Sequence, residues 1–164
     1  MPTKVLFSNP PWWGDKLPDG KYMAGVRAGS RWPFMMPVRS QPDNYVHGDY
    51  LPYPFFMGYA TTYVAQNTNS DVFFRDSIAL RESYESWWAH LEQEKYDYLF
   101  FEIATPSWSH DFLLITELKS RFPSLKIVIT GPIVLALSES MFLALRIHAA
   151  IKGEYEKGAV RVIN

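Results

Sequence analysis

The chain has 164 residues, of which 48% are hydrophobic and 20% charged, and its formal net charge is −1. This length and composition predict one globular domain rather than a disordered chain. The near-zero net charge gives no electrostatic reason to expect a nucleic acid or an anionic membrane as partner. No apolar run approaches the roughly 20 residues that a membrane helix needs, so no membrane span is expected.

The chain contains no cysteine. This excludes a disulfide framework, a thiolate metal site and a cysteine nucleophile. The N-terminus shows no basic region followed by an apolar signal core, so we expect a cytoplasmic location. The aromatic share is 16%, which is high and indicates either a thick core or a large flat ligand.

The first predicted strand runs from Lys4 to Ser8. It ends at Asn9-Pro10-Pro11, because two prolines cannot continue a strand ladder. Residues 12–52 follow as a long insertion without sustained periodicity. A stretch of this length is normally a functional loop or a disordered one, and we expect a lid that faces a ligand or partner.

A helix is predicted to open at Pro54 and to bury an apolar stripe formed by Phe56, Tyr59, Ala60, Tyr63 and Val64. The next predicted elements are a strand at 71–75, a helix with a stripe of Tyr84, Trp87, Trp88 and Leu91, a strand near 97–103, a helix at about 107–122, a strand at 125–130, a short helix at 137–145, a strand at 147–151 and the start of a helix after Gly153.

Strands that alternate with helices predict an α/β fold with a parallel sheet and helices on both faces. The continuously apolar run Tyr98-Leu-Phe-Phe101 is typical of a strand that is buried on both faces. By analogy with known folds, we expect five strands in the flavodoxin-like (Rossmann-type) order 2-1-3-4-5. Because the chain ends inside a predicted helix, we expect residues 1–164 to be a single domain of a longer protein.

Candidate ligand-binding residues follow four of the predicted strands. In open α/β sheets, ligands sit at the edge where the strands have their carboxyl ends. Glycines there allow a ligand close to the backbone, and hydroxyls can bond neutral polar groups. Plain turn chemistry, which needs the same residue types, remains an alternative for each loop. The residues are Pro10, Pro11, Thr105, Ser107, Gly131, Pro132, Gly153 and Glu154.

Three sets of residues carry predictions of their own. In the insertion, Arg27, Ser30 and Arg31 are candidates to grip an anionic group, or they form a solvated loop. Thr105 or Ser107 is expected to cap the helix at 107–122. Glu102 ends an apolar strand and is expected to bond loop amides rather than to act as a base. The histidines are too scattered along the chain to predict a metal site.

The strand-end motifs together resemble the N-terminal cobalamin-binding domain of cobalamin-dependent radical SAM proteins. The similar segments are Lys-Val-Leu-Phe-Ser-Asn-Pro-Pro at 4–11, Tyr-Pro-Phe-Phe-Met-Gly-Tyr-Ala at 53–60, Thr-Pro-Ser at 105–107, Gly-Pro at 131–132 and Gly-Glu-Tyr-Glu at 153–156. The resemblance implies a flavodoxin-like fold whose strand ends receive the corrin face and the dimethylbenzimidazole tail. It implies no histidine lower ligand, because the Asp-x-His-x-x-Gly motif of methionine-synthase-like domains is absent here.

The expected function is therefore a cobalamin-binding module that presents the corrinoid to a radical SAM catalytic domain. The iron–sulfur cluster and S-adenosylmethionine would belong to that separate domain, since this chain has no cysteine, and this chain would not itself be an enzyme. One alternative is a degenerate domain that keeps the fold without the cofactor and shapes a substrate site or a protein interface. A flavin domain is another, because Thr105-Pro-Ser107 and nearby aromatics could hold an isoalloxazine.

Overall fold

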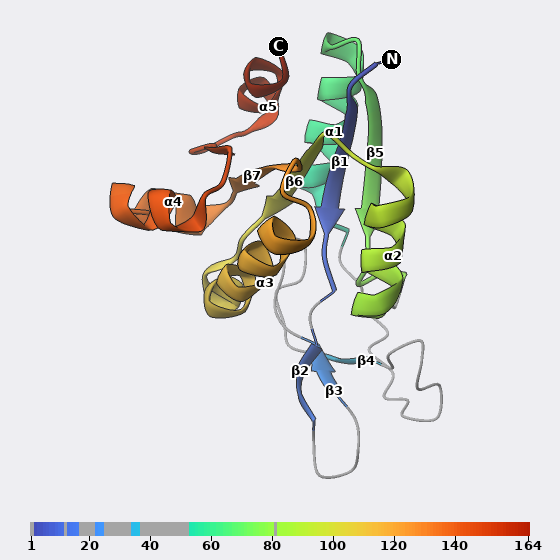
Figure 1. Ribbon diagram of the computed structural model, residues 1–164, viewed down its shortest axis with the longest axis vertical. Coiled ribbons are helices and arrows are strands. Elements are labelled where there is room, and N and C mark those ends of the chain that lie inside the picture. Colours follow the sequence, from blue (N-terminus) through green and yellow to red (C-terminus); the bar gives the residue numbers. More distant parts are fainter. Residues whose placement is uncertain (1, 12, 17–21, 25–33, 37–52, 81) are drawn as a thin grey trace.

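A computed structural model describes residues 2–11, 13–16, 22–24, 34–36, 53–80 and 82–164. Its centre is a five-stranded parallel sheet (Figure 1). The strands are β1 (Lys4–Asn9), β5 (Asp71–Asp76), β6 (Tyr98–Glu102), β7 (Lys126–Thr130) and β8 (Ala149–Ala150). Their spatial order is β5-β1-β6-β7-β8. If these five strands alone are numbered in chain order, β5 is the second strand and the spatial order is 2-1-3-4-5. The predicted flavodoxin-like order is thus confirmed.

Helices cover both faces of this sheet, as predicted (Figure 1). One face carries α2 (Tyr84–Glu94), α3 (Trp108–Arg121) and α4 (Glu139–Leu145), and the other carries α1 (Phe55–Asn67) and α5 (Glu156–Ile163). Two 3-10 helices, η1 (Thr105–Ser107) and η2 (Pro132–Ala136), follow the carboxyl ends of β6 and β7.

The strands of the main sheet are apolar on both sides because each side packs against helices. In β6, Tyr98 and Phe100 join the core under α1 and α5, while Leu99 and Phe101 join the core under α2 and α3. Burial of alternate residues on opposite faces explains the continuous apolar run that identified this strand.

The apolar face of α1 agrees with the predicted stripe at Ala60 and Val64 and differs from it elsewhere. The helix buries Met57, Ala60 and Val64, whereas Phe56 and Tyr59 are 63% and 60% exposed. Both sets recur at helical spacing, so periodicity alone could not choose between them. The helix packs against both the sheet and α5, and smaller side chains allow this close approach.

The fifth strand is shorter than predicted, with β8 limited to Ala149–Ala150. It lies at the edge of the sheet and pairs only with β7. Backbone hydrogen bonds from His148 to Ile127 and from Ile151 to Ile129 continue the contact on both sides. The predicted range 147–151 therefore marks the paired segment, of which only the centre has full strand geometry.

The insertion after β1 contains structure that the sequence did not predict. Three short strands, β2 (Trp13–Lys16), β3 (Tyr22–Ala24) and β4 (Phe34–Met36), form an antiparallel sheet of their own. Their shortness explains why no periodicity is visible in the sequence. The predicted ligand residues Arg27, Ser30 and Arg31 lie outside the described residues.

No helix among the described residues is long and apolar enough to cross a membrane.

Candidate functional site

A polar residue ends each of the four longer strands of the main sheet. β1 and β5 end at Asn9 and Asp76, and β6 and β7 end at Glu102 and Thr130. These residues are register partners in neighbouring strands, so their side chains stand along one edge. This is the edge at which ligands bind in open α/β sheets.

The outer part of this edge, at β1 and β5, is occupied by an internal hydrogen-bond network. The Asn9 side-chain amide donates to Asp76 Oδ1 over 3.0 Å, and the backbone amides of Ile78 and Ala79 donate to the same oxygen. Burial raises the pKa of the Asp76 carboxyl, and these hydrogen bonds act in the opposite direction. Asp76 therefore serves the turn that follows β5.

The topological switch point of the sheet lies between β1 and β6, because the connection from β1 leads to one side and all later strands lie on the other. We call this place the crossover point. Pro10 and Pro11 are both buried there. The Tyr84 hydroxyl lies 2.6 Å from the Pro11 carbonyl oxygen and 2.5 Å from His110 Nε2. This bridge ties the chain leaving β1 to helices α2 and α3. His110 thus lies partly buried against Tyr84 rather than freely on the helix surface.

Ser107 is at the N-cap position of α3, but its side chain makes no capping hydrogen bond, contrary to prediction. Its hydroxyl is fully buried and lies 3.0 Å from the Ala104 carbonyl oxygen and 2.5 Å from Asp111 Oδ2. Thr105 is exposed and begins η1. Neither residue makes a side-chain cap, because η1 runs directly into α3 and satisfies the turn with backbone hydrogen bonds.

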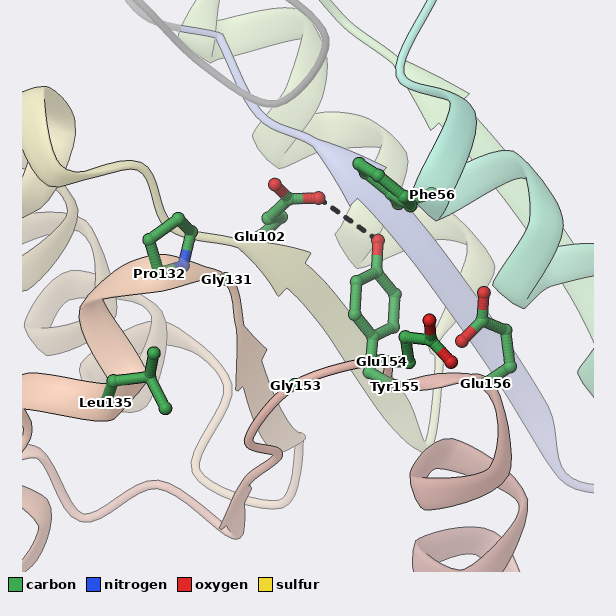
Figure 2. A pocket seen from close by; sticks show the side chains of 9 residues that line it. All are labelled: Phe56, Glu102, Gly131, Pro132, Leu135, Gly153, Glu154, Tyr155 and Glu156. Carbon is green, nitrogen blue, oxygen red and sulfur yellow. Dashed lines mark hydrogen bonds between the residues drawn. The ribbon is translucent and has the colours of Figure 1, made fainter.

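The cavity at this edge lies farther along the sheet, between the ends of β6 and β7 and the segment that leads from β8 into α5 (Figure 2). Its volume is about 320 Å³. We call it the edge cavity. Its lining residues are Phe56, Glu102, Gly131, Pro132, Leu135, Gly153, Glu154, Tyr155 and Glu156.

The edge cavity contains the predicted residues Gly131, Pro132, Gly153 and Glu154. The other described candidates, Pro10, Pro11, Thr105 and Ser107, do not line it. The structure therefore divides the predicted site into the edge cavity and a second region at the crossover point, where Pro10, Pro11 and Ser107 are buried and Thr105 is exposed.

Glycines occur at the two turns of the edge cavity because of the backbone. Gly131 has a φ of 103° and Gly153 a φ of 76°, a region that residues with side chains rarely adopt. A Cβ on Gly131 would lie 2.6 Å from the Ile103 carbonyl oxygen. A Cβ on Gly153 would meet nothing within 4 Å. Gly131 is thus required by the neighbouring strand, and Gly153 leaves open space beside the cavity.

Glu102 and Tyr155 form the polar centre of the edge cavity. The Tyr155 hydroxyl donates to Glu102 Oε2 over 3.2 Å (Figure 2). The sequence predicts hydrogen bonds from loop amides to Glu102. Among the described residues, its partner is instead the side chain of Tyr155, which was not a predicted site residue. Burial raises the pKa of the Glu102 carboxyl above its usual value, and the hydrogen bond from Tyr155 opposes this shift.

The pKa of Tyr155 is also raised, chiefly by burial and further by the charge of Glu102. Its hydroxyl therefore stays protonated and remains a donor at neutral pH. The pair joins the end of β6 to the start of α5 through side chains alone.

Several residues of the edge cavity were not among the predicted site residues. Tyr155 and Glu156 directly follow Gly153-Glu154 and could have been included on that ground. Leu135 follows Gly131-Pro132 by one helical turn. Phe56 was predicted to lie in the core, so no feature of the sequence indicated that it lines a cavity. Among the described residues, no group of three or more histidine, aspartate or glutamate side chains is placed to hold a metal ion.

Comparison with protein-family models, with curated proteins and with solved structures finds no match to this chain.

Proposed function

We propose that the chain is a cobalamin-binding module that presents a corrinoid to a radical SAM catalytic domain within a longer protein. The observation that carries the proposal is the position of the resembling motifs. Asn9-Pro10-Pro11, Thr105-Pro-Ser107, Gly131-Pro132 and Gly153-Glu154 all lie at the carboxyl edge of a sheet with flavodoxin-like strand order.

The residues at this edge are compatible with a large, mostly neutral ligand. The side of Gly153 is open, so a flat ligand can approach the backbone there. Phe56, Pro132 and Leu135 offer apolar contact in the edge cavity. The carboxylates of Glu102 and Glu154 can accept hydrogen bonds from carboxamide side chains, which a corrinoid carries around its ring.

The size of the edge cavity limits what it can hold. At about 320 Å³, it accommodates a small part of a corrinoid, and the remainder would rest on the strand ends. When bound, the corrinoid would supply the methyl-transfer or radical chemistry of the full protein. This chain's own residues would bind and orient it.

The alternative is a degenerate domain that has lost the cofactor and forms a protein interface or shapes a substrate site. It is favoured by the aromatic side chains at the start of α1, since Phe55, Phe56 and Tyr59 are all more than half exposed.

Hydrogen–deuterium exchange with and without hydroxocobalamin tests the location of the site. We expect slower exchange of backbone amides at 103–107, 131–135 and 153–156, because a ligand on this edge would cover them. The opposite edge, at 96–98 and 123–126, serves as an internal control and should not change. Protection confined to the control segments, or none at saturating ligand, would count against the proposal.

A further inference from the structure

Independently of the corrinoid proposal, the side chains that line the edge cavity indicate a particular kind of ligand. The described residues that line it include three glutamates, Glu102, Glu154 and Glu156, and no lysine, arginine or histidine. Lys152 and Lys157 are close in sequence but do not line the cavity. The described side chains thus give the cavity a negative charge, although the chain as a whole is nearly neutral.

The carboxylates are set in an apolar frame. The rings of Phe56 and Tyr155 and the side chains of Pro132 and Leu135 form the remaining walls (Figure 2). Aromatic faces attract cations, and apolar walls lower the local dielectric and strengthen charge interactions. An anionic group would meet repulsion here, and a purely apolar group would leave the carboxylates without partners.

Glu102 has capacity for a ligand. Tyr155 bonds its Oε2, and the other oxygen, Oε1, has no partner among the described residues. The Glu102 side chain is partly buried, and partial burial is unfavourable for a charged group unless a donor or a cation satisfies it. Tyr155 supplies one hydrogen bond but no positive charge.

The spacing of the acids argues against a bare metal ion. Within the part of the chain that the structure describes, these side chains do not converge into a metal-holding group. Carboxylates spread around an apolar cavity suit an elongated ligand, whose charged head reaches Glu102 while its stem lies along the rings.

We propose that the edge cavity binds an organic cation, namely a protonated primary amine or guanidinium group on a short apolar stem. Two sources share this chemistry: a free small amine, and a lysine or arginine side chain of a partner protein. The inference does not depend on the corrinoid proposal, because a chain that binds such a cation and no cobalamin would support one and not the other.

The test compares three probes of similar size and different charge with the full chain. They are n-butylammonium, 1-butanol and butanoate, each titrated at fixed ionic strength and followed by the NMR amide signals of 131–135 and 153–156. We expect n-butylammonium to bind about tenfold more tightly than 1-butanol, a difference of about 1.4 kcal/mol, and butanoate not to bind measurably. Equal affinity for the amine and the alcohol would overturn the proposal.

Matched variants locate the charge that is responsible. Glu102→Gln keeps the shape of the side chain and an acceptor for Tyr155 but removes the negative charge. It should reduce the preference for n-butylammonium over 1-butanol to about twofold or less, because the carboxylate that pairs with the ammonium group is lost. A second variant, Glu154→Gln, changes an exposed residue. It should fold normally and weaken amine binding in part. Glu92→Gln removes the same charge from the surface of α2, outside the edge cavity, and should change nothing. An unchanged preference in both cavity variants would contradict the proposal.

The pH dependence gives a further check. The groups facing the cation are Glu102, Glu154, Glu156 and Tyr155, and the tyrosine stays protonated. Since burial places the pKa of Glu102 above its usual value, amine affinity should rise as the pH increases through that raised pKa. This pH dependence should be much smaller in Glu102→Gln, and an affinity that falls over this range would oppose the proposal.

The two sources are then separated with Nα-acetyl-lysine N′-methylamide. If it binds as tightly as n-butylammonium, the cavity can accept a partner's side chain. If the added peptide groups abolish binding while the simple amine still binds, the ligand is a free amine. Either result supports the cation site, and absence of binding by both cations would refute it.

Discussion

At the scale of single residues, the two strand-end glycines show why a sequence motif can have different causes at different positions. Gly131 is required by the packing of its own turn against β6, since a Cβ there would collide with the Ile103 carbonyl. Gly153 has a similar positive φ but no such neighbour. The motif Gly-Pro at 131–132 therefore reflects the fold, whereas the space beside Gly153 is open to a ligand.

This difference predicts unequal stability losses. Gly153→Ala should lower the free energy of unfolding by about 1 kcal/mol, the cost of placing a side chain in the left-handed region. Gly131→Ala should cost about 2–4 kcal/mol, because backbone displacement is added to that strain. Urea denaturation of both variants measures the two values. Equal losses would mean that the contact with Ile103 relaxes without cost.

The backbone at Gly131 and Gly153 also decides which variants can test the ligand site. A bulky residue at either glycine would obstruct a ligand that approaches the backbone closely. Since φ is positive at both positions, such variants would confuse unfolding with loss of binding. Substitutions at Glu102 and Glu154 avoid that problem.

At the scale of elements, the strands were predictable and the orientation of α1 was not. A strand buried on both faces has a continuous apolar run, and Tyr98-Leu-Phe-Phe101 matches β6 closely. Helix α1 is apolar nearly all round, so its sequence supports more than one buried face. Only the packing against α5 and the sheet selects Met57 rather than Tyr59.

The buried face of α1 can be tested by a pair of truncations. Met57→Ala should lower the free energy of unfolding by about 2–4 kcal/mol, because it leaves a cavity in the core beneath the helix. Tyr59→Ala, which removes a 60% exposed side chain, should cost less than about 1 kcal/mol. Thermal or urea unfolding distinguishes the two. A larger loss for Tyr59→Ala would restore the stripe that the sequence predicted.

The elements around the edge cavity were only partly predictable. The strand ends that form its walls follow from the alternation of strands and helices, and they include Gly131 and Gly153. The bond between Glu102 and Tyr155 joins residues 53 positions apart, and no local pattern in the sequence indicates such a contact. The short strands β2, β3 and β4 were missed because runs of three or four residues show no reliable period.

At the scale of the whole molecule, the strand order places every resembling motif on one edge but gives these motifs different environments. The crossover point is filled by Pro10, Pro11, Ser107 and the bridge through Tyr84. The open space lies at the far side of β6, in the edge cavity. In the part of the chain that the structure describes, a corrinoid would therefore rest on a packed surface at the crossover point and enter the molecule at the edge cavity.

The central claim is that this chain binds cobalamin, and the most direct measurement is an anaerobic titration of hydroxocobalamin followed by its visible absorption. We predict a saturable spectral change with micromolar or tighter affinity, so that a site at about 100 μM protein is nearly full. A spectrum that shows no saturation at that protein concentration, with the chain folded, would contradict the account and favour the degenerate domain.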